Sequence, residues 1–160
     1  MIEDITPCTL ATDDRVGLFR SRIFKDCKSD DDYLEIFLST DTIEYAEKCV
    51  EHINNMPDEM VDTICRAIIK SSTKEYELEN VRDILKYCRF YFLYTFDWEI
   101  EDKEIAYTVD GYSEWGKDIV FAVRGNRVLY VGNCSHLSSL EVCSPWKDDA
   151  YYKNLNSNCI

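Results

Sequence analysis

The sequence predicts an α+β fold: one domain with a mostly antiparallel sheet that two or three helices cover on one face. Several short segments alternate apolar and polar residues, as half-buried strands do. Three other segments repeat apolar residues at helical spacing. Apolar runs on both sides of Gly125-Asn126 indicate a β-hairpin, because these residue types tolerate positive φ. A chain of 160 residues can bury a sizeable core, so we expect residues 1–160 to form a single domain.

Two strands are predicted in the first part of the chain. Residues 1–14 show no periodic pattern, and we expect a loose N-terminal segment there. Residues 16–24 alternate, with Phe19 and Ile23 on one face and Arg20 on the other. Residues 33–38 alternate in the same way and form the second predicted strand.

Three helices are predicted at residues 41–54, 57–70 and 80–88. Asp41 with Glu44, and Asn80 with Asp83, have the spacing of a capping box at a helix start. Pro57 suits the first turn of the second helix, since its missing N–H is not needed there.

Residues 90–100 predict a central strand with an aromatic face. The aromatic and apolar residues of equal parity would lie on one side of such a strand: Phe90, Phe92, Tyr94, Phe96, Trp98 and Ile100. Alternation of this kind is more typical of a core than of a ligand platform.

Three further strands are predicted at residues 105–110, 119–124 and 127–131. The last two flank Gly125-Asn126, and their hairpin is the clearest local signal in the chain. After Gly132 the periodicity fades, so residues 133–160 are expected to form an irregular tail.

The charge balance narrows the class of partner. The chain has 31 Asp and Glu against 18 Lys and Arg, a formal net charge of -13. Such a field repels phosphate backbones, so we expect no nucleic-acid binding. The charge favours a basic protein as partner, or cations, or it only keeps the chain soluble.

The sequence also indicates a cytoplasmic protein without a membrane span. No run of about 20 apolar residues occurs, and the N-terminus lacks the apolar region of a secretory signal. The 8 Cys are dispersed, with no C-x-x-C pair, and reduced thiols are the favoured interpretation.

The best candidate surface is the connection between two predicted strands, with Tyr112, Glu114, Trp115 and Asp118. Aromatic rings flanked by carboxylates suit a basic partner, because an Arg side chain can stack and form an ion pair at once. The acidic residues Asp97, Glu99 and Glu101 would extend this surface. The alternative is structural: a Trp packed over the sheet edge, with the acids in solvent.

Catalytic and metal sites have weaker support. Cys134, His136 and Cys143 are zinc ligand types, but their spacing matches none of the usual zinc motifs. We therefore expect no metal and no cofactor. Asp110, Glu114 and Asp118 lie close together in the sequence and could serve as paired carboxylates in a hydrolase.

The second half of the chain, about residues 80–132, resembles small bacterial domains of unknown function. The resemblance is carried by an aromatic strand, by Asp-Gly-Tyr-Ser-Glu-Trp ending at Trp115, and by a hairpin ending in Arg-Val-Leu-Tyr-Val-Gly. These domains are similar to the cytosolic immunity proteins of polymorphic toxin systems. The resemblance implies a bacterial, cytosolic, non-catalytic α+β domain.

Our leading hypothesis is a protein-binding module, in particular an immunity protein that neutralises a basic toxin through an acidic face. One alternative is a small enzyme that depends on a Cys or on the carboxylates near Trp115. The other is a structural or self-associating protein.

Overall fold

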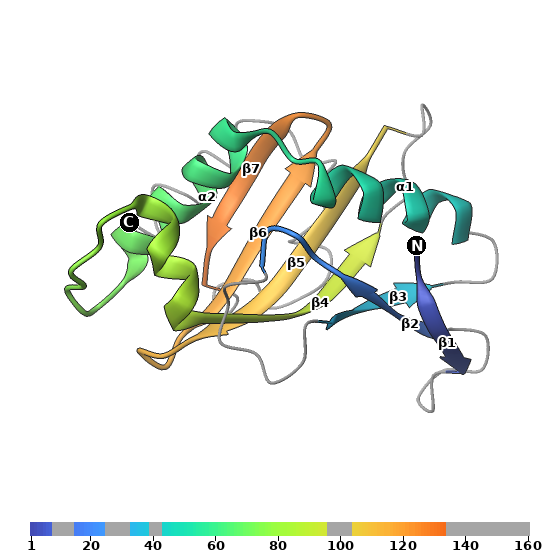
Figure 1. Cartoon of the computed structure of the whole chain (residues 1–160), viewed down its shortest axis with the longest axis horizontal. Helices are drawn as coiled ribbons and strands as arrows, with labels where there is room; N and C mark the ends of the chain where they lie inside the picture. Colours follow the sequence, from blue (N-terminus) through green and yellow to red (C-terminus); the bar gives the residue numbers. More distant parts are fainter. Residues whose placement is uncertain (8–14, 25–32, 39–42, 96–103, 134–160) are drawn as a thin grey trace.

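The computed structural model contains a seven-stranded sheet in which the spatial order of the strands follows the chain (Figure 1). The structure describes residues 1–7, 15–24, 33–38, 43–95 and 104–133. The strands are β1 (Glu3–Pro7), β2 (Arg15–Arg20), β3 (Tyr33–Leu38), β4 (Cys88–Thr95), β5 (Ala106–Ser113), β6 (Asp118–Arg124) and β7 (Arg127–Gly132). The helices are α1 (Ile43–Asn54), α2 (Asp58–Ser71) and the short 3-10 helix η1 (Val81–Tyr87).

All neighbouring strands are antiparallel except β3 and β4. These two are parallel because α1, α2 and η1 together return the chain to the end of the sheet from which β3 started. The predicted α+β class and mostly antiparallel sheet are confirmed.

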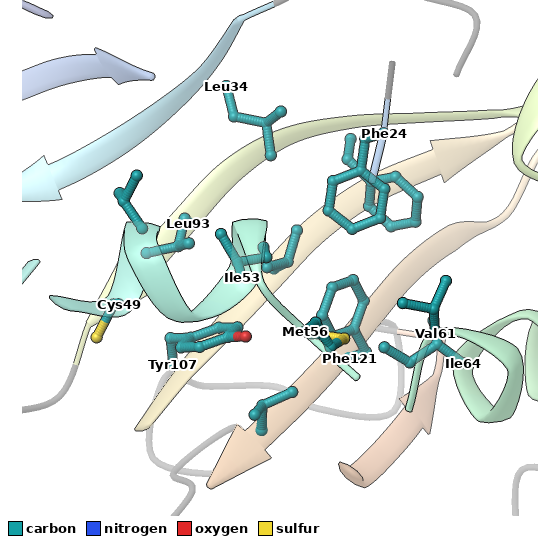
Figure 2. Packing of buried hydrophobic residues seen from close by; sticks show 14 of the residues in the cluster. Phe24, Leu34, Cys49, Ile53, Met56, Val61, Ile64, Leu93, Tyr107 and Phe121 are labelled. Carbon is teal, nitrogen blue, oxygen red and sulfur yellow. The ribbon is translucent and has the colours of Figure 1, made fainter. Parts of the chain in front are cut away.

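The helices α1 and α2 lie on the same side of the sheet, as Figure 1 shows. Each presents an apolar stripe, which includes Val50 and Ile53 on α1 and Ile64 and Ile68 on α2. Figure 2 shows these helices meeting strand residues such as Phe121. The predicted cover on one face is therefore confirmed.

The N-terminal part of the sheet differs from the sequence prediction. Residues 3–7, expected to lie in a loose segment, form β1 and pair with β2. The register shifts between Glu3 and Thr6, and Asp4 has a φ of 49°. This irregular backbone hides the strand from a search for strict alternation.

The second strand ends earlier than predicted, at Arg20. The chain then turns, and Phe24 enters the core, where its ring centroid lies 4.5 Å from that of Phe90 and 5.8 Å from that of Phe121. The alternation of residues 21–24 thus reflects a turn with two inward side chains, and not a strand.

The predicted single aromatic face of residues 90–100 is wrong within β4. The register with β5 shifts between Phe90 and Phe92, so Tyr91 is an extra residue in a β-bulge. The bulge changes the parity: Phe90 and Leu93 are buried in the core, whereas Phe92 pairs with Asp110 on the opposite face. Residues 96–100 lie outside the described residues.

Gly111 makes this bulge sterically acceptable. A Cβ atom at Gly111 would lie 2.6 Å from the Phe90 ring and 2.6 Å from the Arg89 carbonyl oxygen. Any larger residue would push β4 and β5 apart at this point.

Polar contacts hold α1 against β5 and the β6–β7 turn. The Nδ1 atom of His52 lies 2.9 Å from the Tyr107 hydroxyl, and its Nε2 atom lies 3.3 Å from the Asn126 side-chain oxygen. The Asn126 side-chain oxygen can only accept, so the matching tautomer of His52 donates from Nε2 and accepts a hydrogen bond from the Tyr107 hydroxyl at Nδ1. Tyr45 adds a link, since its hydroxyl donates to the Glu104 carbonyl at 2.6 Å. Each buried hydroxyl thereby gains a partner across two elements.

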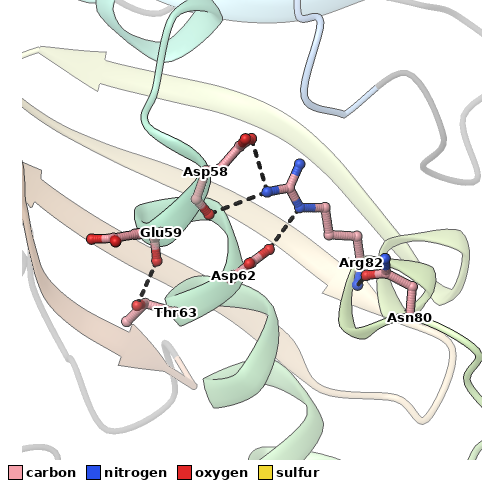
Figure 3. A network of polar contacts seen from close by, with 6 residues as sticks. All are labelled: Asp58, Glu59, Asp62, Thr63, Asn80 and Arg82. Carbon is pink, nitrogen blue, oxygen red and sulfur yellow. Dashed lines mark hydrogen bonds and ion pairs between the residues drawn. The ribbon is translucent and has the colours of Figure 1, made fainter.

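The third helix is a 3-10 helix, with the predicted capping box at its start. The Asn80 side chain accepts from Arg82 N, and the Asp83 carboxylate accepts from Asn80 N. Figure 3 shows how Arg82 attaches this helix to α2: its guanidinium donates to Asp62 at 2.7 Å and to the Asp58 carboxylate at 2.9 Å. The cap for the first helix, at Asp41, lies outside the described residues.

Candidate functional site

The candidate site lies on the sheet face opposite α1 and α2, which we call the distal face. Side chains alternate along β5 and β6, so Asp110 and Tyr112 lie on this face while Val109 points to the helices. Asp118 is directly opposite Tyr112 in the register of β5 and β6. The fold therefore places Asp110, Tyr112 and Asp118 within one small area.

Asp110 has the least favourable environment of these three residues. Its neighbours on the adjacent strands are Phe92 and Val120, both apolar. It is half-buried, and no hydrogen bond or ion pair reaches its carboxylate from any other described residue. Burial, and secondarily the Asp118 carboxylate, raises the pKa of Asp110 to about 6. An ionised carboxylate without a partner in such a place is a common sign of a functional site.

Tyr112 and Asp118 are accessible to a partner. The Tyr112 side chain is 47% exposed, one of few large apolar side chains at the surface of the described part. Asp118 is exposed beside it. The register also places Arg89 of β4 next to Tyr112, so the row across the three strands is Arg89, Tyr112, Asp118. The distal face here combines an aromatic ring with both signs of charge, and only its Asp110–Asp118 side is acidic.

Trp115 does not belong to this exposed surface. Its side chain is only 9% exposed and packs with the core, with its ring centroid 5.9 Å from that of Tyr76. The buried Nε1 atom of Trp115 has no hydrogen-bond partner among the described residues. The geometry thus supports a structural role for Trp115, as a packed side chain, and not a role in contacting a partner.

Glu114 and the turn around it are held by backbone contacts. The Glu114 amide donates to the Tyr87 carbonyl at 2.9 Å, and Ser113 and Lys117 are joined by three hydrogen bonds of 2.8–3.0 Å. Gly116 has a φ of 82°, a conformation that favours glycine. The turn is therefore well defined, with the Glu114 side chain exposed.

The other predicted site residues lie outside the described residues: Asp97, Glu99 and Glu101 of the acidic extension, and Cys134, His136 and Cys143 of the zinc hypothesis. Within the described part, no group of three or more His, Cys, Asp or Glu is arranged to hold a metal ion. The zinc hypothesis for Cys134, His136 and Cys143 therefore stays a prediction from the sequence.

The described cysteines have the properties of core residues. Cys49, Cys65 and Cys88 are buried in the core. Burial raises the pKa of Cys65 to about 11 and that of Cys88 to about 12. A thiol in this state is a weak nucleophile at neutral pH, because the reactive form is the thiolate.

Sequence reasoning placed Asp110 among the carboxylates but not in the predicted binding surface, and it missed Arg89. The signal for Asp110 was present: it is the one carboxylate inside an otherwise uncharged alternating segment. The position of Arg89 depends on the register of β4, which the bulge sets, and so had no local signal.

A depression of about 400 Å³ lies near the end of α1. It is lined by Met1, Arg22, Glu47, Val50, Glu51, Asn54 and Asn55. Asn54 already bonds the backbone of Arg20 and Arg22, so its role there is structural. We consider the distal face the stronger candidate, because its carboxylate, Asp110, is half-buried and has no partner among the described residues.

Comparison with known proteins does not assign this chain to a class of protein. No protein-family model matches the chain, and neither a curated protein nor a solved structure matches it with significance. Among the described residues, no helix has the length and apolar character needed to cross a membrane.

Proposed function

We propose that this chain is a protein-binding module whose distal face receives a basic side chain of a partner protein. The observation that carries the proposal is Asp110, a half-buried carboxylate without a partner among the described residues. Keeping such a group ionised at neutral pH lowers the stability of the free protein. A cation from a partner would remove this penalty on binding.

The neighbours of Asp110 define the chemistry of the partner group. Asp118 adds a second carboxylate, and the Tyr112 ring is exposed next to it. An Arg guanidinium can form ion pairs with carboxylates while its plane stacks on an aromatic ring. A Lys ammonium could form the ion pairs but would gain less from the ring, so we expect Arg to be preferred.

We further propose that the partner is a basic toxin and the chain its bacterial, cytoplasmic immunity protein. The resemblance of residues 80–132 to immunity-protein-like domains and the net charge of -13 support this assignment. Co-expression with a candidate toxin encoded beside this gene tests it: survival of the cells should require Asp110. Survival that is equal with wild-type protein and Asp110→Asn would contradict the assignment.

The binding proposal can be tested before any partner is known. Titration with acetyl-tetra-arginine amide, followed by NMR, should shift the resonances of Asp110, Tyr112 and Asp118. Tetra-lysine should bind more weakly. Asp110→Asn should abolish the shifts, whereas Glu47→Gln, which removes an exposed charge from α1, should not.

The pH dependence gives an independent check on Asp110. Because burial raises the pKa of Asp110 to about 6, only about a tenth of this carboxylate is ionised at pH 5. Affinity for the arginine peptide should therefore fall about tenfold from pH 7 to pH 5. An affinity that does not change over this range, or shifts that spread evenly over the acidic surface, would contradict the proposal.

The second candidate is a hydrolase that uses Asp110 and Asp118 as acid and base. It is favoured by one observation, that the pKa of Asp110 is raised to about 6 beside a second, exposed carboxylate. It predicts turnover of chromogenic glycoside or ester substrates with a pH optimum near 6 and loss of that activity in Asp110→Asn. Binding of arginine peptides without turnover of any such substrate would favour the binding module.

A further inference from the structure

The segment from Ser72 to Asn80 crosses from the end of α2 to the start of η1, and we call it the strap (Figure 1). Most of its side chains are exposed. Its hydrogen bonds lie at its two ends: Ser72 bonds with Lys74, and Asn80 caps η1. The middle of the strap must therefore be held against the rest of the protein by apolar side chains.

Two side chains provide that anchoring. Tyr76 and Leu78 pack against the core, while Glu75, Glu77 and Glu79 between and beside them are exposed. The Tyr76 ring centroid lies 4.2 Å from that of Tyr87 and 5.9 Å from that of Trp115. Tyr76 thus packs on the aromatic side chains at the end of η1 and in the β5–β6 turn.

The contact between Tyr76 and Trp115 is chemically incomplete. The Tyr76 hydroxyl and the Trp115 Nε1 atom are both inaccessible to solvent, and neither has a hydrogen-bond partner in the part of the chain that the structure describes. Burial, together with the Glu114 carboxylate, raises the pKa of Tyr76. Buried polar groups are nearly always paired, so two orphans in one contact need an explanation.

We propose that the strap opens about its two ends, lifting Tyr76 away and exposing Trp115 and Tyr87. Opening hydrates both orphaned groups, which offsets part of the apolar contact that is lost. The closed state is the one in the structure, and the open state is a minor state in equilibrium with it.

Opening would enlarge the surface that a partner can contact. Trp115 lies in the turn that joins Tyr112 to Asp118. This turn is close to the Tyr112 side chain, since a Cβ atom built at Gly116 would lie 3.6 Å from the Tyr112 hydroxyl. Glu75, Glu77 and Glu79 make the strap itself attractive to a basic protein. The use of this surface by a partner rests on the proposed function, but the opening does not.

Hydrogen exchange of the Trp115 indole N–H tests the opening directly. In the full chain with Trp98→Phe and Trp146→Phe, a single indole signal reports on Trp115. If the strap opens locally, this proton exchanges faster than the slowest core amides of β5 and β6, and its rate depends little on urea. If it exchanges only with global unfolding, with the same urea dependence as those amides, the proposal is wrong.

Two substitutions at Tyr76 should change the indole exchange rate of Trp115 in opposite directions, which a purely structural role of Tyr76 would not predict. Tyr76→Phe removes the orphaned hydroxyl and should slow indole exchange about tenfold, whereas Tyr76→Ala should accelerate it at least tenfold. Tyr33→Phe, a matched change on β3, should leave the rate unchanged. Equal rates in wild type and Tyr76→Phe would overturn the proposal. No partner or peptide is used, so failure here is distinct from failure of the arginine-binding test.

Discussion

At the scale of single residues, Asp110 makes the sharpest stability prediction. The folded protein binds a proton at Asp110 more tightly than the unfolded chain does, because burial raises its pKa from 3.8 to about 6. The resulting stabilisation is complete below pH 3.8 and is lost as the pH rises through 6. Asp110→Asn should therefore stabilise the protein by about 1–2 kcal/mol at pH 8, after allowance for partial exposure.

Urea denaturation at pH 4 and pH 8 measures this effect. The variant and wild type should be nearly equal at pH 4 and differ at pH 8. A variant that is less stable than wild type at pH 8 would mean that the carboxylate has a stabilising partner. A gain of stability together with a loss of arginine binding is the pattern expected of a residue retained for function.

Trp115 and Tyr112 form a matched pair of aromatic residues that the structure separates into core and surface. Trp115→Ala should reduce the free energy of unfolding by about 3–5 kcal/mol, because it removes a large buried ring. Tyr112→Ala should change it by no more than about 0.5 kcal/mol. Urea denaturation of both variants compares them, and equal losses would contradict the assignment of Trp115 to the core.

The two residues also show why the sequence could not separate these roles. Both are aromatic residues beside acids in one short connection. What buries Trp115 is Tyr76, which comes from a distant part of the chain. No local pattern reports such a contact, and therefore Trp115 was predicted at the surface.

At the scale of elements, the ion pairs of Arg82 are the link between η1 and α2. Arg82→Met should cost about 1 kcal/mol, since it removes charge-assisted hydrogen bonds to Asp58 and Asp62 from a partly exposed site. Lys86→Met on the same helix breaks the ion pair with Asp83, which lies within one turn and does not join two elements, and should cost less than about 0.5 kcal/mol. Thermal unfolding of the two variants tests this order, and a larger loss for Lys86→Met would contradict it.

Elements were predictable where their signals are local. The capping box of Asn80 and Asp83 and the hairpin at Gly125-Asn126 need only a few neighbouring residues, and both occur as predicted. The bulge in β4 does not: Phe90 and Phe92 have the same parity, and only Gly111 on the next strand allows the backbone to separate them. The strand β1 was missed for a similar reason, because its register is irregular.

At the scale of the whole molecule, the net charge of -13 leads to the prediction of a basic partner but does not locate a site. Total charge says nothing about which carboxylates are paired. Glu44, Asp58 and Asp83 all have basic partners, whereas Asp110 has none among the described residues. The distinction depends on tertiary structure, and for this reason the sequence alone does not single out Asp110.

The agreement between strand order and chain order has a consequence for how the protein folds. Six strand pairs join neighbours along the chain, and five of them are hairpin-like antiparallel pairs whose formation requires little loss of chain entropy. The sixth, β3 with β4, must close the long excursion from Leu38 to Cys88. We expect this step to limit the folding rate.

Stopped-flow refolding can locate that step. Ile36→Val and Leu93→Ala, at a paired position across β3 and β4, should slow refolding in proportion to the stability they remove. Val128→Ala on β7 should instead mainly accelerate unfolding. If so, β1–β3 and β4–β7 form early as two independent meanders. The native state then forms when β3 pairs with β4, the one strand pair that joins the two meanders within the sheet.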